Sequence, residues 1–323
     1  MNILITGADG FIGRALTQRL VREDASPASP LPRIGRLTLV DLGFDGAETP
    51  KLRRLHGSIA DPAVVARAFD TPVDIVFHLA SIPGGMAEQR YELARQVNVE
   101  ATQNLLEAAR LQTLGGSRPP IWVFASSIAV LGGPLPAAVD DATPPRPTLS
   151  YGAHKLIGEI LAADFSRRGW VDARCIRLPG VVARPPQRTG QLTAFLSDII
   201  RELAEGRDFA CPIPADCTTW LMSIHCVVDN LLHAATLPAD ACAGSRTWTL
   251  PALRASMALL VEAIGVAFAT DAAARVSYGT NAGLEANFGR HPPLSTPDAE
   301  SAGFRHDGDL PTLVRRALAP IDR

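Results

Sequence analysis

The sequence predicts an α/β fold, a doubly wound parallel sheet with helices on both faces. The first observation is the start of the chain, MNILITGADGFIG, where a short apolar run, Asn2–Thr6, leads directly into three glycines. Such a run predicts a buried strand, and the glycines predict a tight turn into a helix. The second observation is that strand-like and helix-like stretches alternate along the chain, which is typical of a parallel sheet.

The glycine turn has the spacing GxxGxxG, formed by Gly7, Gly10 and Gly13. We expect Gly7 to permit the sharp turn, Gly10 to let the backbone approach a pyrophosphate, and Gly13 to let the helix pack closely on the strand. The phosphates would then lie on the helix N-terminus. An ordinary glycine loop is the alternative, but the strand directly before the glycines favours a dinucleotide site.

Length and composition set wide limits. The 323 residues suffice for one large α/β domain or two smaller ones, and the net charge of −2 gives no sign of nucleic acid or an anionic membrane as partner. No apolar run approaches the roughly 18 residues of a membrane span, and the start lacks the basic region of a signal peptide. We therefore expect a cytoplasmic protein. The five cysteines are widely spaced without a CxxC pair, which predicts buried free thiols and no metal site.

The second strand is expected at Leu37–Val40, after a loop rich in proline and serine at Asp24–Arg36. This strand ends on Asp41, whose carboxylate can accept hydrogen bonds from the adenine ribose hydroxyls of NAD. No arginine follows directly to neutralise a 2′-phosphate, so the sequence favours NAD over NADP. A strand-end aspartate that only caps a turn is the alternative.

A further strand is expected at Asp74–His78, and a glycine-containing loop, Ser81–Glu88, follows it. This loop would lie at the carboxyl end of a parallel strand, where open α/β sheets bind ligands. His78 follows an apolar run, so we expect a packed structural histidine rather than a catalytic one.

Two later stretches predict the chemistry. The strand Ile121–Ala125 ends in a serine pair that includes Ser127, and Tyr151 and Lys155 form a YxxxK motif at the start of an amphipathic helix. Positions i and i+4 share a helix face, so the phenol and the ammonium can point into one cavity. A free tyrosine has a pKa near 10. We expect Lys155 and the cationic nicotinamide to lower the pKa of Tyr151 so that it serves as a base, with Ser127 holding the substrate oxygen.

With these motifs the chain resembles the extended short-chain dehydrogenase/reductases, the NAD-dependent epimerase/dehydratase family, over nearly its whole length. The resemblance implies a Rossmann-like sheet and a smaller C-terminal substrate domain. Residues 1–178 would bind NAD, together with a returning segment near 223–250 that contains a helix predicted at Val227–Ala235. Residues 179–323 would mainly bind the substrate.

The resemblance also implies which residues hold NAD. Stretches corresponding to the family's cofactor contacts occur at Gly57–Asp61, after the strand that ends at His78, and in NVEATQNLLEAAR, which contains Asn98. Ser58 replaces an acid that the family often has, so Ile59 is the firmer match there, and a solvated helix residue is the alternative for Asn98. The implied NAD-binding residues are Gly7, Gly10, Phe11, Ile12, Gly13, Asp41, Ser58, Ile59, Leu79, Ala80, Ser81, Asn98, Tyr151, Lys155, Pro179 and Val181.

The chain departs from the nucleotide-sugar enzymes of the family where they bind their substrate. Gly180 stands in place of an asparagine and Thr219 in place of an arginine, which argues against a nucleoside diphosphate because buried phosphate needs cationic partners. RLPG resembles the RYPG of short-chain L-threonine dehydrogenases, and ASIPGG with RLPGVVARP resembles the D-erythronate dehydrogenases, a group that oxidises the hydroxyl beside a carboxylate. Arg184 is the candidate for binding that carboxylate, and an exposed surface arginine is the alternative.

The predicted reaction is therefore the NAD-dependent oxidation of the 2-hydroxyl of a small sugar acid, foremost D-erythronate, to a 2-oxo acid. Ser127, Tyr151 and Lys155 would be catalytic, and Ser81, Ser127, Tyr151 and Arg184 would bind the acid. The alternatives are a nucleotide-sugar 4-epimerase, which would use the same residues without net NADH, and a non-catalytic NAD-binding sensor. Analogy with the family predicts a homodimer.

Overall fold

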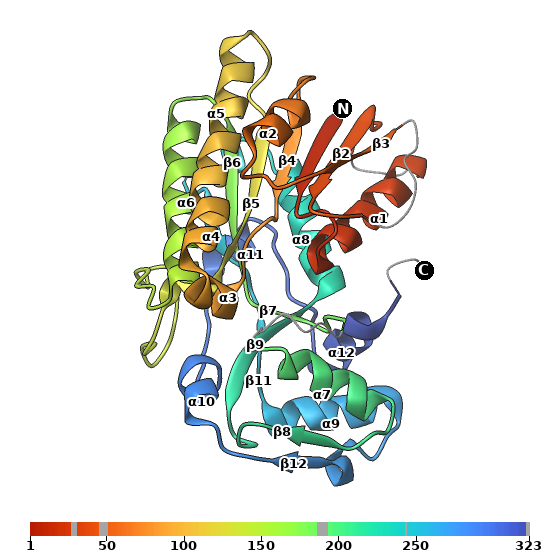
Figure 1. Cartoon of the computed structure of the whole chain (residues 1–323). Helices are drawn as coiled ribbons and strands as arrows, with labels where there is room; N and C mark the ends of the chain where they lie inside the picture. The colour runs from red at the N-terminus through yellow and green to blue at the C-terminus, as the bar shows by residue number, and fades with distance from the viewer. Residues whose placement is uncertain (27–30, 45–50, 186–192, 243, 321–323) are drawn as a thin grey trace.

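The computed structural model describes residues 1–26, 31–44, 51–185, 193–242 and 244–320, and a seven-stranded sheet forms its largest part (Figure 1). All neighbouring strands of this sheet are parallel. In spatial order they are β10 (Thr247–Thr249), β6 (Asp172–Leu178), β5 (Ile121–Ser127), β4 (Ile75–His78), β1 (Asn2–Thr6), β2 (Arg36–Asp41) and β3 (Leu52–His56). The strand order reverses between β1 and β4, which is where such sheets bind ligands. The predicted α/β fold is confirmed.

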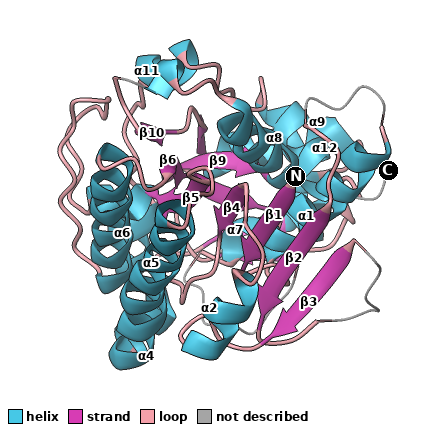
Figure 2. Cartoon of the chain, turned by 90° about the horizontal axis from the view of Figure 1, so that it is seen from above, coloured by secondary structure: helices cyan, strands magenta, loops and turns pink. Residues whose placement is uncertain are grey.

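Helices cover both faces of this sheet (Figure 2). One face has α1 (Phe11–Ala25) and α8 (Ile224–Thr236), and the other has α2 (Pro62–Ala68), α5 (Ala101–Leu114) and α6 (Ser150–Arg167). Successive side chains of β1 enter different cores, Ile3 and Ile5 on the α1 side and Leu4 on the α5 side. Because a strand buried on both faces needs apolar residues at every position, β1 reads as a continuous apolar run.

A smaller unit lies below the main sheet in Figure 1. It contains a three-stranded sheet of β7 (Gly180–Val182), β9 (Thr218–Ser223) and β11 (Leu253–Ser256), and a two-stranded sheet of β8 (Phe209–Cys211) and β12 (Val276–Tyr278). Its helices are α7 (Phe195–Ala204), α9 (Met257–Phe268), α10 (Ala282–Phe288) and α12 (Leu310–Leu318). An apolar core between α7, α9 and α12 holds this unit together. That the unit binds the substrate stays a prediction.

The chain crosses back to the main sheet twice. The first return comprises α8 and β10, within the segment expected near 223–250. The second comprises α11 (Pro297–Ser301) and the residues directly after it. Ala299 in this helix and Phe304 beyond it are completely buried in the same core as α8. The Asp307 carboxylate then accepts hydrogen bonds from the backbone N–H and the hydroxyl of Ser223. This second return was not predicted, because its two apolar residues show no periodic pattern in the sequence.

Two predicted loops are shorter than expected. Helix α1 continues to Ala25, so the loop predicted from Asp24 starts later, and its residues 27–30 lie outside the described part of the chain. The predicted loop Ser81–Glu88 is wrong in its second half, which forms helix α3 (Gly84–Gln89). Ala87 is fully buried there, and this tertiary burial outweighs the weak helix propensity of the glycines.

Strand β3 was not expected at all. Its sequence, LRRLH, buries Leu52 and Leu55 but places two arginines between them, so it lacks the apolar run of an inner strand.

Burial of the cysteines agrees with the prediction, since all five are buried free thiols. Among the described residues, we find no helix with both the length and the apolar character needed to cross a membrane.

Candidate active site

The glycine turn has the geometry that a dinucleotide requires. Gly7 has φ +70°, and a Cβ there would lie 2.7 Å from the backbone nitrogen of Ala80. A Cβ on Gly13 would lie only 2.1 Å from the carbonyl oxygen of Gly7. The first turn of α1 therefore packs directly on the β1 turn, an arrangement in which the N-terminus of a helix can bind phosphate.

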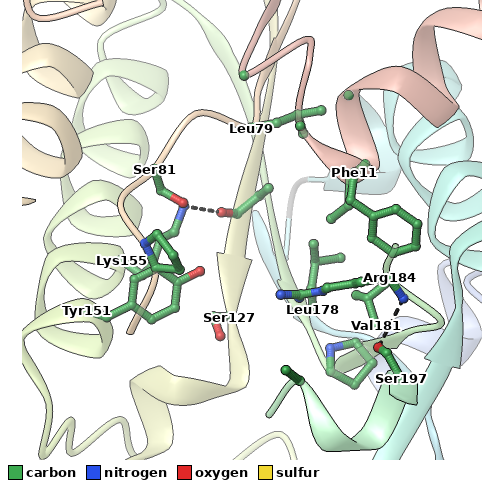
Figure 3. A pocket seen from close by; sticks show the side chains of 18 of the residues that line it. Phe11, Leu79, Ser81, Ser127, Tyr151, Lys155, Leu178, Val181, Arg184 and Ser197 are labelled. Carbon is green, nitrogen blue, oxygen red and sulfur yellow. Dashed lines mark hydrogen bonds between the residues drawn. The ribbon is translucent and has the colours of Figure 1, made fainter. Parts of the chain in front are cut away.

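A cavity of about 670 Å³ opens at the carboxyl ends of β1, β4, β5 and β6. This volume suits an organic ligand of the size of a drug or cofactor. Among the residues that the sequence assigned to a site, the cavity is lined by Gly7, Gly10, Phe11, Ile12, Gly13, Leu79, Ser81, Ser127, Tyr151, Lys155, Pro179, Val181 and Arg184. Figure 3 shows Ser81, Tyr151 and Lys155 on one wall, with Phe11 and Arg184 opposite.

A second cavity of about 530 Å³ adjoins the first. The two share five lining residues, namely Pro83, Ser127, Tyr151, Pro179 and Arg184. The predicted catalytic residues Ser127 and Tyr151 therefore lie where the two spaces meet. A cofactor in the larger cavity and a substrate in the smaller one would both touch this boundary.

Helix α6 brings the predicted base to the end of β5 through close backbone packing. A Cβ on Gly152 would lie 2.2 Å from the carbonyl oxygen of Ala129, which follows Ser127. This close approach places Tyr151 beside Ser127, and both residues line the cavity. One turn later the buried Lys155 donates from Nζ to the carbonyl oxygen of Ala125, at 2.7 Å.

The electrostatics of Tyr151 differ from the expectation in one respect. Burial raises the pKa of Tyr151, and this is the largest effect. The positive charge that acts against it belongs to Arg184, helped by hydrogen bonds from Ser81 and Ser127. That the Lys155 charge also lowers the pKa of Tyr151 stays a prediction, and Lys155 Nζ lies 5.7 Å from the centroid of the Tyr151 ring. Burial also lowers the pKa of Lys155, to about 7, which weakens that charge.

Arg184 reaches the site from the segment that follows β7. Its backbone N–H donates to Ser197 Oγ of α7 at 3.0 Å, and its guanidinium acts on Tyr151 across the cavity. Burial lowers the pKa of Arg184, although a guanidinium stays charged at any physiological pH. Arg184 is half-buried, so the reading of a plain surface arginine does not fit. The site thus offers a cation next to a phenol.

Asp41 lies at the end of β2, beside the glycine turn. Its Oδ2 accepts a hydrogen bond from the backbone N–H of Asp9 at 2.9 Å, and its Oδ1 accepts one from Leu42 at 2.7 Å. The carboxylate is therefore held at the rim of the turn, which suits both the predicted ribose contact and the capping alternative. It does not line the large cavity itself.

Four other residues assigned to NAD do not line this cavity, namely Ser58, Ile59, Ala80 and Asn98. Asn98 lies in a π-helical turn, η1 (Gln96–Glu100), between α4 (Tyr91–Arg95) and α5. Its side chain accepts from the backbone N–H of Ile82 at 2.7 Å and donates to the Ile82 carbonyl oxygen at 3.0 Å. Asn98 thus braces the loop after β4. Direct contact of these four residues with NAD stays a prediction.

His78 is a packed residue, as expected. Its ring nitrogens bond to the hydroxyls of Thr6 and Thr102 at 2.7 and 2.8 Å. Burial lowers the pKa of His78 to about 3, so the ring is neutral and takes no part in proton transfer at physiological pH.

Sequence reasoning missed the residues that the smaller unit contributes. Arg290, His291 and Trp220 line the second cavity, and the ring of His291 packs edge-on against Trp220, with 4.7 Å between centroids. A β-bridge to Thr218 positions Arg290 at the start of β9. Trp220 precedes the adjacent Arg290 and His291 by about 70 positions in the chain. None of the three belongs to a motif, so only the fold could identify them as neighbours. Arg290 also places a positive charge at the second cavity, where Gly180 and Thr219 had led us to expect no charged residue.

Fold and site together define a dinucleotide-dependent enzyme with a serine, a tyrosine and a lysine at the end of its cofactor cavity. Comparison with known proteins agrees. The model of the NAD dependent epimerase/dehydratase family matches residues 3–229, and the chain belongs to this family, the extended short-chain dehydrogenase/reductases. Its cofactor is NAD.

Several relatives match over most of their length. A protein from Cupriavidus necator named D-erythronate dehydrogenase is 36% identical over 318 residues, covering 98% of this chain and 97% of the relative. One of the same name from Haemophilus influenzae is 33% identical over 254 residues, covering 78% and 77%. The solved nucleoside-diphosphate-sugar epimerase from Agrobacterium tumefaciens has a TM-score of 0.90 at 30% identity, covering 97% of this chain and 92% of that one. The chain is thus similar both to named dehydrogenases and to a named epimerase.

Proposed function

We propose that this enzyme oxidises the 2-hydroxyl of a small sugar acid, D-erythronate or a close analogue, to the 2-oxo acid with NAD. The observation that carries the proposal is the position of Arg184, whose guanidinium faces Tyr151 at the boundary of the two cavities. A planar cation can bind a carboxylate in bidentate fashion, and here it would hold the hydroxyl on the adjacent carbon against the base. The curated relatives named D-erythronate dehydrogenase support the same reading.

Each step would use a side chain that lines one or both cavities. Arg184 pairs with the carboxylate, and Ser127 donates a hydrogen bond to the substrate oxygen and orients it. The phenolate of Tyr151 takes the hydroxyl proton as general base. NAD, held at the turn of Gly7, Gly10 and Gly13, would supply the acceptor for the hydride from the carbon that bears this hydroxyl. Lys155, fixed by its bond to Ala125, would hold the ribose of the cofactor.

Replacing Arg184 by methionine should raise KM for the acid by about 10- to 100-fold, because a hydrogen bond to a charged group contributes roughly 1.5–3 kcal/mol. KM for NAD should change far less. Both constants come from initial rates of NADH formation with D-erythronate and related 2-hydroxy acids. Arg207→Met is the matched control, since Arg207 lines neither cavity and its side chain is 50% exposed. An equal rise for both substrates, or none for the acid, contradicts the proposed role.

A nucleotide-sugar 4-epimerase remains the second candidate, and Arg290 is the observation that favours it, because it could pair with a phosphate in the second cavity. Gly180 and Thr219 offer no charge beside it. The same enzyme preparation should therefore be given UDP-glucose and UDP-galactose in a coupled assay, and we expect no turnover. Efficient epimerisation without NADH from any acid would replace the proposal by this candidate.

Cofactor preference gives an independent test at Asp41. We expect the wild type to prefer NAD, because its carboxylate repels a 2′-phosphate, and Asp41→Ala to weaken NAD binding and reduce that preference. Asp41→Asn is the control, since its amide oxygen can still accept from Asp9 while the charge is gone. Kinetics with both cofactors decide, and equal wild-type efficiency with NADP would remove this role from Asp41.

We also propose a cytoplasmic homodimer in which α5 and α6 pack against their partners. The basis is the row of apolar side chains that these two helices leave exposed. They are Leu111 and Leu114 on α5, and Ile157 and Ile160 on α6.

A further inference from the structure

A buried carboxylate with three hydrogen bonds lies one helical turn from the predicted catalytic Lys155. Glu159 follows Lys155 by one turn of α6 and is 4% exposed. Its Oε1 accepts from Arg177 Nε at 2.9 Å and its Oε2 from Arg177 Nη2 at 2.8 Å, which makes the pair bidentate. Ser126 also donates its hydroxyl to Oε1. Glu159 thereby joins α6 to the carboxyl ends of β5 and β6.

Lys155 needs a compensating charge because it is almost fully buried, at 3% exposed. The groups that face it on other elements provide none. His78 on β4 is neutral, and the ring of Phe124 on β5 offers its π-face, 4.8 Å from Nζ. Tyr151, on the same helix, is an anion only when it acts as base. Of the described groups that act on Lys155, Glu159 is the carboxylate, and it raises the pKa of Lys155 against the effect of burial.

We propose that Glu159 is a positioning residue that keeps Lys155 protonated and aimed at the cofactor cavity. It acts through Lys155 and touches neither substrate nor cofactor. Arg177 and Ser126 occupy the oxygens of Glu159, so Lys155 bonds to Ala125 instead of folding back onto the acid. Buried ion pairs tolerate loss of one partner poorly, and the bidentate bond to Arg177 holds the Glu159 carboxylate one helical turn from Lys155. The effect of Glu159 on turnover rests on the proposed function, whereas its effect on the protonation of Lys155 does not.

The first test needs neither cofactor nor substrate. The pKa of Lys155 is lower in the folded chain, about 7, than in the unfolded one, so between these values the unfolded state binds more protons and the unfolding free energy rises with pH. Glu159→Gln should lower the folded pKa by about one unit or more, as removal of a nearby opposite charge does. The rise should then start near pH 6. Urea unfolding at half-unit intervals from pH 5.5 to 9 measures it.

Asp172→Asn is the matched control. Like Glu159, Asp172 is a carboxylate that pairs with arginine. It accepts from Arg174 at 2.7 Å and from Arg246 at 2.6 Å, at the opposite end of β6. Asp172→Asn should lower the unfolding free energy without moving the pH at which this free energy begins to rise. His78 titrates in every variant alike and cancels in the comparison. If Glu159→Gln and Asp172→Asn show the same pH dependence, Glu159 is only structural and the proposal fails.

Two further measurements complete the test. If Glu159→Gln does not fold, the double variant Glu159→Gln/Arg177→Met, which removes both charges of the buried pair, is unfolded in its place, and a rise of the unfolding free energy that starts at the wild-type pH overturns the proposal. In the enzyme assay, the alkaline limb of kcat should move to lower pH in Glu159→Gln and stay in place in Asp172→Asn. If no hydroxy acid is oxidised, the proposed function fails, while the unfolding measurement still decides on Glu159.

Discussion

Replacing Tyr151 by phenylalanine is expected to lower kcat by at least about 10²-fold, the usual contribution of general base catalysis. The change removes the phenolic hydroxyl at the boundary of the two cavities, where Tyr151 lies together with Ser127. NAD binding should change little, because Lys155 keeps its bond to Ala125. Initial rates of NADH formation and a fluorescence titration with NAD measure the two effects separately.

The pH profile strengthens this test. Burial raises the pKa of Tyr151 and the Arg184 charge opposes that effect, so wild-type kcat should increase with pH as the phenolate forms. The increase should be lost in Tyr151→Phe. Tyr278→Phe is the control, since Tyr278 is 38% exposed on β12 in the smaller unit. Wild-type turnover by Tyr151→Phe, under conditions where chemistry limits the rate, would assign the base elsewhere.

The second large effect is expected at the glycine turn. Gly13→Ala places a methyl group 2.1 Å from the carbonyl oxygen of Gly7 and 2.7 Å from Ala8 Cα. Both are backbone atoms, so the first turn of α1 must move away from β1. Its N–H groups would then no longer face the phosphates, and NAD affinity should fall at least about tenfold. Overpacking of this kind also costs roughly 1–3 kcal/mol of unfolding free energy.

Calorimetric titration with NAD and urea unfolding check both parts of that expectation. Gly43→Ala is the matched control, because a Cβ there meets no atom within 4 Å although the residue follows β2 in the same region. It should leave NAD affinity and stability near the wild-type values. Unchanged NAD affinity in Gly13→Ala would show that the cofactor does not use the N-terminus of α1.

The sequence by itself determined the elements whose signals are local. The strand before Gly7 and the spacing to Gly13 predicted the dinucleotide turn, because both the positive φ and the close helix contact depend on residues within one turn. Likewise, Tyr151 and Lys155 share a helix face wherever that helix packs. Strand β3 escaped prediction for the opposite reason, since LRRLH is a strand only through pairing with β2 along its whole length.

Only the tertiary structure decided which groups surround the base. Arg184 acts on Tyr151 although 33 positions separate them, and no periodicity marks Arg290, His291 or Trp220 as neighbours in the second cavity. The sequence therefore could not show that the Arg184 charge opposes the effect of burial on Tyr151. Electrostatic effects depend on distance and burial in three dimensions, and these emerge when β5, α6 and the segment after β7 meet at one edge of the sheet.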